Sequence, residues 1–473
     1  QLTDAGSAFL YGNRPHEIFL RQLLKFQLPS PYHKEGRKIR GTFWGRPYLE
    51  IIRLIRDLDH LTPDEFRIFA LQLTDYRNYE TVKQQIIAFR AEKERHKGQY
   101  KRFVDDIINR EISKIYAAEI ESGDISTRES KTSDVKSFIK KEKRNMRDYA
   151  DACFRYFRFT EMFVSDGRSI QIAPDKIPEI DYILETVPRE PTHIDDATAF
   201  KSYLFDSAQP RLYTDDRSNL EDTLMRYFSY SKRELVGKTI EELKDLRDSA
   251  VQAKRAAIIQ KQTEELKSYA LYQEVIDTYN EILSDDVYDA PLFLEWNTWR
   301  AMTMLDGGTI KGNFKIDDSG RPTSTAQGNM PDIECDYDTF ALSVEVTLQR
   351  GQRQYESEGE PVTRHYAQLQ KATKKTTYCL FIAPSINRAT WAHFFGLNQI
   401  RNIAAYGGKP KIIPLELDSF MRLIENSYAS NGIPQPQDVQ TFLQTAIDEI
   451  ENSADEIDWS NRIAAYVDKW LVA

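Results

Sequence analysis

The stretch PDIECDYDTFALSVEVT, residues 331–347, determines the fold predicted for the C-terminal half of the chain. It predicts two strands, over 332–337 and 340–348, that are separated by a short turn. Asp332 begins the first strand, and Glu345 lies within the second. Adjacent strands can bring two such carboxylates to one end of a sheet, close enough to share a hard divalent cation such as Mg²⁺. Glu345 stands in an otherwise apolar strand, where a carboxylate is costly to bury unless it binds a metal ion or a proton.

The sequence around this stretch predicts a mixed α/β core over 288–420. Its further elements are strands over 311–316, 378–383 and 411–417, and helices over 289–305, 362–374 and 388–405. Glu295 on the preceding helix adds a third carboxylate, while Glu358 and His365 fall on the next loop and helix. The alternative is that these acids are surface groups in a chain with 73 Asp and Glu, and that His365 is a structural histidine.

The N-terminal part is predicted to be mainly helical. Helices are expected over 15–29, 46–58, 79–97, 100–119 and 133–157, with another helix beginning at Pro63 and a small β-hairpin around Asp166-Gly167. Short helices on short connections are compatible with a helix-turn-helix or winged-helix module. We therefore predict a domain over 1–200, a linker over 201–222, and a second domain over 223–473 that starts with a helical hairpin over 232–285.

Charge is distributed unevenly along the 473 residues, whose formal net charge is −9. Residues 1–160 contain 31 Lys and Arg against 23 Asp and Glu, whereas the remainder contains 33 against 50. An acidic chain with a basic N-terminal third suggests two modules with different tasks.

The densest basic stretch spans 127–158 and is interleaved with aromatic residues. It is interpreted either as a surface that contacts DNA phosphates or as the solvated face of an amphipathic helix, and composition does not separate the two. The candidate DNA-binding residues are Arg128, Lys131, Lys136, Lys140, Lys141, Lys143, Arg144 and Arg147.

Several protein classes are not expected. No apolar run approaches the roughly 18–20 residues of a membrane span, and the first residues do not resemble a signal peptide. Cys153, Cys335 and Cys379 are far apart and odd in number, which fits reduced thiols in a cytoplasm better than disulfides or a zinc site. The sequence does not begin with Met, which leaves open whether the native N-terminus lies upstream.

Several short motifs resemble one family. Met330-Pro331-Asp332, Val344-Glu345-Val346-Thr347, Glu358 and Val362-Thr363-Arg364-His365-Tyr366 resemble the cleavage core of AlwI-like type IIS restriction and nicking endonucleases, a branch of the PD-(D/E)XK nuclease superfamily. Leu294-Glu295-Trp296 is similar to the upstream helix of that family. Similarity continues in the N-terminal part at 89–95, 97–99 and 155–160.

The resemblance implies a helical, winged-helix-like recognition domain followed by an α/β nuclease domain of PD-(D/E)XK type. It also implies Mg²⁺-dependent cleavage of double-stranded DNA a few base pairs outside a short asymmetric site. Asp332 and Glu345 would hold Mg²⁺, helped by the Val346 carbonyl and Glu295. The lysine of the superfamily is Thr347 here, so Glu358 or His365 would orient or activate the water.

Two further possibilities stay open at this point. One is a strand-specific nicking enzyme or the large subunit of a heterodimer, in which a second copy or a small catalytic subunit completes double-strand cleavage. The other is a non-catalytic DNA-binding protein. No membrane partner is expected.

Overall fold

The computed structural model describes residues 2–32, 43–96, 98–125, 134–284, 286–305, 307–326, 328–430 and 434–472. The chain forms two compact units, Gln1–Ala253 and Lys254–Ala473. The division falls inside the long helix α13 (Ile240–Lys267). Among the described residues, no helix combines the length and the apolar character needed to cross a membrane.

This division differs from the predicted linker over 201–222, because those residues belong to the first unit. They include the end of α10 (Ala197–Phe205) and the start of α11 (Arg217–Phe228). The buried Arg21 fixes the segment between them by donating to the carbonyls of Ala208 and Pro210 and by pairing with Asp215 at 2.8 Å. The Pro- and Asp-rich composition suggested a linker, but side-chain bonds to its backbone hold this segment in place.

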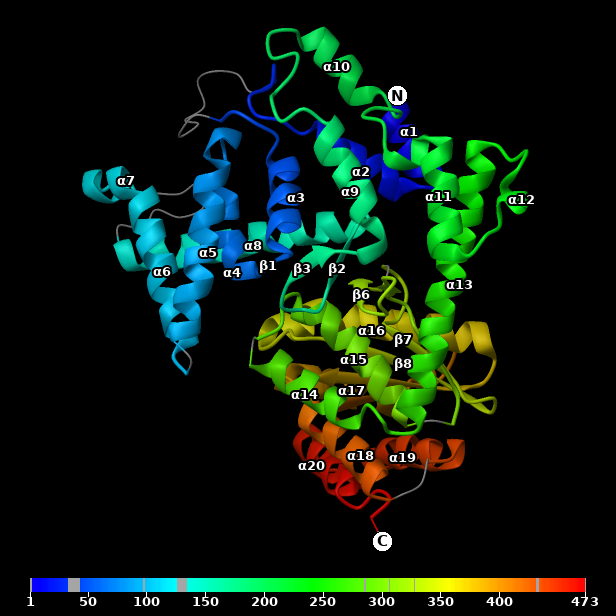
Figure 1. Ribbon diagram of the computed structural model, residues 1–473. Coiled ribbons are helices and arrows are strands. Elements are labelled where there is room, and N and C mark those ends of the chain that lie inside the picture. The colour runs from blue at the N-terminus through cyan, green and yellow to red at the C-terminus, as the bar shows by residue number, and fades with distance from the viewer. Residues whose placement is uncertain are drawn as a thin grey trace. The chain divides into compact units, whose positions relative to one another are not determined.

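The first unit is mainly helical, with one small antiparallel sheet in the order β1 (His60–Leu61), β3 (Ile170–Ile172), β2 (Phe163–Ser165) (Figure 1). The pairing of β2 with β3 confirms the hairpin predicted around Asp166-Gly167. The remaining helices are α1 (Asp4–Tyr11), α2 (Pro15–Lys25), α3 (Pro47–Leu58), α4 (Pro63–Ile68), α5 (Tyr79–Arg95), α6 (Tyr100–Ile115), α7 (Ala117–Ser122), α8 (Val135–Phe159), α9 (Ile177–Thr186) and α12 (Lys232–Leu235).

The helix predicted to begin at Pro63 shows how local sequence sets an element boundary. Thr62 caps α4 by accepting from the Glu65 N–H, and the Glu65 carboxylate accepts from the Thr62 N–H. This capping box satisfies two backbone donors that a helix start otherwise leaves unpaired. The winged-helix interpretation of the unit stays a prediction.

The second unit contains a five-stranded mixed sheet in the order β10 (Ile412–Glu416), β9 (Thr376–Ala383), β8 (Phe340–Val346), β7 (Ile333–Asp336), β4 (Thr309–Gly312). The β10–β9 and β9–β8 pairs are parallel, and the β8–β7 and β7–β4 pairs are antiparallel. A two-stranded ribbon, β5 (Lys315–Ile316) with β6 (Pro322–Ser324), lies outside this sheet. The predicted mixed α/β core is thus confirmed as a mixed sheet with helices.

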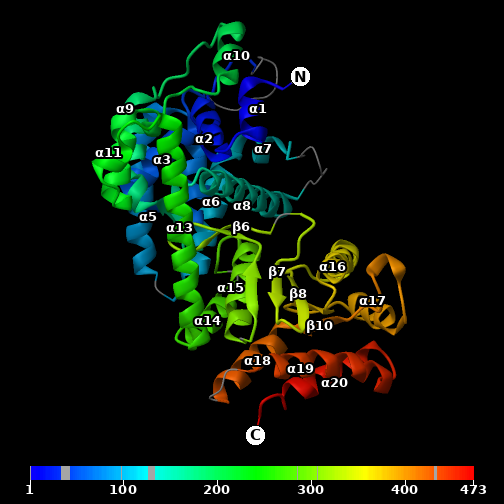
Figure 2. The ribbon, with the colours of Figure 1, turned by 90° about the vertical axis from the view of Figure 1, so that its right-hand side faces the viewer.

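Helices surround this sheet, and Figure 2 shows α15 (Ala290–Met304) and α16 (Gln352–Thr373) on opposite sides of β7 and β8. Every residue of α15 except Pro291 is buried, which explains why its sequence is apolar over most of its surface. The other helices of the unit are α14 (Tyr272–Leu283), α17 (Arg388–Gln399), α18 (Leu417–Ala429), α19 (Pro436–Asp448) and α20 (Glu456–Val467).

The prediction for α16 was wrong at its start, because the helix begins ten residues before 362 and includes Pro361. Gly359 and Pro361 suggest a break, but the first turns are held by Gln354. Its side-chain amide donates to the carbonyls of Gln349 and Ser385, both at 2.9 Å, and accepts from the Asn387 N–H at 2.8 Å. Tertiary bonds therefore extend the helix, and Glu358 lies on a helix instead of a loop.

Candidate active site

Asp332 and Glu345 meet at one end of the β7–β8 pair. Ile333 is paired with Val344, so Asp332, one residue before β7, lies next to Glu345 in the antiparallel register. The Val346 N–H donates to Asp332 Oδ2 at 2.8 Å, which fixes the aspartate against the end of β8. The expectation that adjacent strands bring the two carboxylates together is met.

His365 of α16 completes a buried pair with Glu345. His365 Nδ1 lies 2.9 Å from Glu345 Oε1, and both residues are less than a tenth exposed. The second ring nitrogen, Nε2, is also buried and has no hydrogen-bond partner among the described residues. If Nδ1 carries the proton that Glu345 accepts, Nε2 presents a lone pair.

Glu295 and Glu358 approach the same cluster from α15 and α16. Glu295 is buried, and its Oε2 accepts from the Ala326 N–H at 2.9 Å. Glu358 Oε1 accepts from the Thr347 hydroxyl at 2.9 Å. Thr347 therefore tethers one of the acids, a contact that no local sequence pattern predicts.

The carboxylates of the cluster are held in an environment that opposes their charge. Burial, followed by the charge of Asp332, raises the pKa of Glu295 to about 9. Burial and the Glu345 charge raise the pKa of Asp332 well above its usual value, although the Val346 N–H opposes this shift. Burial, followed by the charges of Glu358 and Glu295, raises the pKa of Glu345. Crowded, buried carboxylates of this kind are typical of functional sites and favour a bound cation or proton.

The donor chemistry of this cluster fits a hard cation, since carboxylate and carbonyl oxygens are the ligands that Mg²⁺ prefers. In the described part of the chain, no three His, Cys, Asp or Glu side chains already converge as metal ligands. Asp332 and Glu345 are engaged instead by the Val346 N–H and by His365. Metal binding at this cluster is therefore a proposal, in which the ligands are Asp332, Glu345, Val346 and Glu295.

Asn313 is a site residue that the sequence did not reveal. Its side-chain amide donates to the Pro331 carbonyl at 2.8 Å and to Glu334 Oε1 at 3.1 Å. Its backbone N–H donates to the Asp332 carbonyl at 3.0 Å. Asn313 thus fixes the peptide units on both sides of Asp332 from a turn between β4 and β5, a role that only tertiary structure discloses.

The candidate DNA-binding residues fall on or before α8. Arg128 and Lys131 lie outside the described residues. Lys136, Lys140, Arg144 and Arg147 are exposed on α8, and Lys141 is half-buried there. Lys143 forms an ion pair with Asp105 of α6.

The opposite face of α8 buries Phe138, Ala150, Phe154 and Phe157. The predicted helix is therefore present, and it is amphipathic with a basic exposed face. Both interpretations of that face, a phosphate-contacting surface and a solvated face, are compatible with this arrangement.

Comparisons with known proteins point to one family. Residues 1–423 match the family model described as AlwI restriction endonuclease. The comparison with curated proteins finds no match. Among solved structures, the small subunit of a heterodimeric restriction endonuclease is 27% identical, with 41% of this chain and 98% of that chain covered and a TM-score of 0.35. A TM-score of this size does not establish a shared fold.

Proposed function

The chain belongs to the AlwI restriction endonuclease family and is a site-specific endonuclease, and on this basis we propose that it hydrolyses double-stranded DNA with Mg²⁺ as a type IIS enzyme. Cleavage would occur a few base pairs outside a short asymmetric site. The observation that carries the catalytic part of this proposal is the meeting of Asp332 and Glu345 at one end of adjacent strands, with the pKa of both raised.

In this proposal Asp332 and Glu345 hold the ion, with the Val346 carbonyl and Glu295 beside them. Bound Mg²⁺ would polarise the scissile phosphate and lower the pKa of a water molecule. His365 would accept a proton from that water through Nε2, while Glu345 would orient the ring through Nδ1. Glu358, fixed by Thr347, is the alternative acceptor.

Each chain would cut one strand per event, because the described residues contribute one such cluster. Double-strand cleavage then requires a second copy or a small catalytic subunit, and a single chain acting alone would be a strand-specific nicking enzyme. The proposal of a non-catalytic DNA-binding protein is not supported, since the family is one of endonucleases.

Supercoiled plasmid incubated with the full-length protein and Mg²⁺ tests this function directly. The expected product has breaks at one fixed position relative to one sequence, which sequencing of the ends identifies. Nicked circles indicate a chain that works alone on one strand, and linear DNA indicates pairing of two chains. Intact plasmid over a range of protein and Mg²⁺ concentrations would contradict the proposal.

The Asn313→Ala variant is expected to cleave plasmid roughly 10–100-fold more slowly, because a small displacement of a catalytic group is costly in rate. The loss should appear in the cleavage step, while DNA affinity stays unchanged. A matched control is Asp336→Ala, which removes an exposed acid of β7 that pairs with Lys375 at 2.5 Å. Unchanged cleavage by the Asn313→Ala variant would show that Asp332 is positioned without it.

The basic face of α8 is expected to contact DNA phosphates. Replacing Lys136, Lys140 and Arg144 with Gln should weaken binding to every sequence and reduce the slope of log K against log salt by about 0.9 for each lost phosphate contact. Anisotropy of a labelled duplex without divalent ions measures both quantities. Replacing exposed Lys232 and Arg233 of α12 with Gln serves as the control, and an equal effect per charge removed would assign the change to net charge alone.

A further inference from the structure

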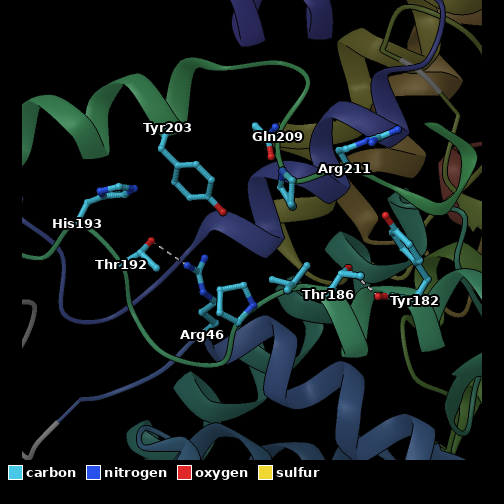
Figure 3. A pocket seen from close by; sticks show the side chains of 11 residues that line it. Arg46, Tyr182, Thr186, Thr192, His193, Tyr203, Gln209 and Arg211 are labelled. Carbon is cyan, nitrogen blue, oxygen red and sulfur yellow. Dashed lines mark hydrogen bonds between the residues drawn. The ribbon is translucent and has the colours of Figure 1, made fainter. Parts of the chain in front are cut away.

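The first unit contains a pocket of about 420 Å³ that the proposed cleavage mechanism does not use. It lies between the end of α9, helix α10 and the chain segments that flank α10 (Figure 3). Its lining combines cationic and aromatic side chains, among them Arg46, His193, Tyr203 and Arg211, and includes no Asp or Glu. A cavity of this size and chemistry is typical of a small-ligand or nucleotide site.

Arg46 gives the pocket a buried positive charge. Its side chain is 1% exposed and donates to the Leu24 carbonyl at 2.9 Å, the Glu190 carbonyl at 3.3 Å and the Thr192 hydroxyl at 3.1 Å. Burial lowers the pKa of Arg46, and only the Tyr203 hydroxyl, which points toward it in Figure 3, opposes this shift. No carboxylate of the described residues pairs with Arg46. A buried guanidinium that lacks an acidic partner is costly, and an anionic ligand would compensate it.

Neighbouring groups strengthen this positive field. Lys25 is fully buried with Nζ 5.4 Å from the centre of the Tyr203 ring, and burial lowers its pKa to about 8, although the nearby Asp206 opposes this shift. Arg211 is exposed on the pocket lining, and its one hydrogen bond to the described residues is a long one of 3.4 Å to the Asp215 carbonyl.

Aromatic rings form another part of the lining. The His193 and Tyr203 rings are 6.0 Å apart, and Figure 3 shows both beside Thr192. His193 has a backbone φ of 55°, an uncommon conformation for a residue other than glycine. Planar rings of this kind are surfaces on which a nucleobase can stack.

We propose that this pocket binds one phosphate group of the DNA substrate, with the adjoining nucleoside against Tyr203 and His193. Arginine recognises phosphate through its charged N–H donors, and one of the five N–H groups of Arg46 remains beyond the bonds to Leu24, Glu190 and Thr192 and the hydrogen bond to Tyr203. The cavity is larger than a phosphate alone, which leaves room for the attached nucleoside. The choice of DNA rests on the enzyme family and not on the Mg²⁺ site.

The test measures DNA binding by the full-length chain without divalent ions, so that no cleavage occurs. Anisotropy of a fluorescein-labelled duplex of mixed sequence is recorded between about 50 and 200 mM salt. The Arg211→Gln variant should bind more weakly, with a salt slope smaller by about 0.9. Tyr203→Ala should weaken binding without a change of slope, because it removes no charge. The Arg233→Gln variant is the matched control, since it removes one exposed charge of the same unit outside the pocket, and it should behave as the parent.

A second arm distinguishes DNA from free phosphates. The parent and the Arg211→Gln variant are melted with inorganic phosphate and with deoxyadenosine monophosphate. If the monophosphate raises the Tm of the parent alone while both proteins bind DNA equally, the pocket serves a free nucleotide and the DNA assignment is overturned. Equal DNA affinity and salt slope in the parent, Arg211→Gln and Tyr203→Ala proteins also overturn it.

Arg211 is exposed, so its replacement keeps the test decisive even if an Arg46→Lys variant fails to fold. Because the readout is binding, a failure of the proposed Mg²⁺ site leaves this result unaffected.

Discussion

Cleavage of plasmid DNA is expected to fall by at least about 10³-fold in the Asp332→Ala and Glu345→Ala variants, about 4 kcal/mol in the barrier. Both carboxylates are proposed to hold the ion. They lie next to each other at the same end of the β7–β8 pair. Removing Asp332 also relieves a charge that raises the pKa of Glu295, and removing Glu345 relieves one that raises the pKa of Asp332. The folded state should therefore tolerate the change, and the loss should lie in chemistry.

Two controls separate this outcome from unfolding and from loss of DNA binding. Melting curves should show a Tm no lower than that of the parent, and duplex affinity without divalent ions should be unchanged. The Asp336→Ala variant removes an exposed acid of the same strand and should keep full activity. Retention of more than about a tenth of the parent rate, roughly 1.4 kcal/mol, by the Asp332→Ala variant would remove that residue from the ligand set.

The sequence predicted the part of the fold in which local pattern and structure agree. The alternation and turn between 331 and 347 were sufficient to expect two paired strands, and the pairing of Ile333 with Val344 then places Asp332 beside Glu345. The apolar strand β9 follows from its composition, since all but the first of its residues are buried. The Asp-Gly hairpin of the first unit follows from turn chemistry.

The remainder depends on contacts between residues far apart in the chain. The position of Glu358 on α16 requires Gln354 to bind the Gln349 and Ser385 carbonyls, which no local propensity reveals. The segment predicted as a linker is held by Arg21, almost 190 residues away in sequence. The hydrogen bonds from Asn313 to the peptide units around Asp332 could not be predicted from the sequence either, because one asparagine in a turn is not a recognisable pattern.

The surroundings of the two ring nitrogens of His365 indicate its role in the proposed mechanism. Nδ1 is 2.9 Å from Glu345, and Nε2 is buried without a partner among the described residues. Burial and the neighbouring Arg364 lower the pKa of His365 from its usual 6.5, while Glu360 and Glu358 oppose this shift. The lowered pKa favours the neutral imidazole, which is the form that accepts a proton.

Replacement of His365 by alanine is expected to slow cleavage by about 10²–10⁴-fold, the usual range for general acid–base assistance, and to leave a measurable residual rate. The parent rate should rise with pH through a pKa below 6.5 and then level off, because only the neutral ring accepts a proton. This inflection should disappear in the His365→Ala variant, and single-turnover cleavage across the pH range measures both effects. His393→Ala is the matched control, since His393 lies on α17 against Tyr355, outside the carboxylate cluster. If the His365→Ala variant cleaves as fast as the parent at every pH while Glu358→Gln is slow, the proton acceptor is Glu358, and the contact between His365 and Glu345 serves to orient the carboxylate.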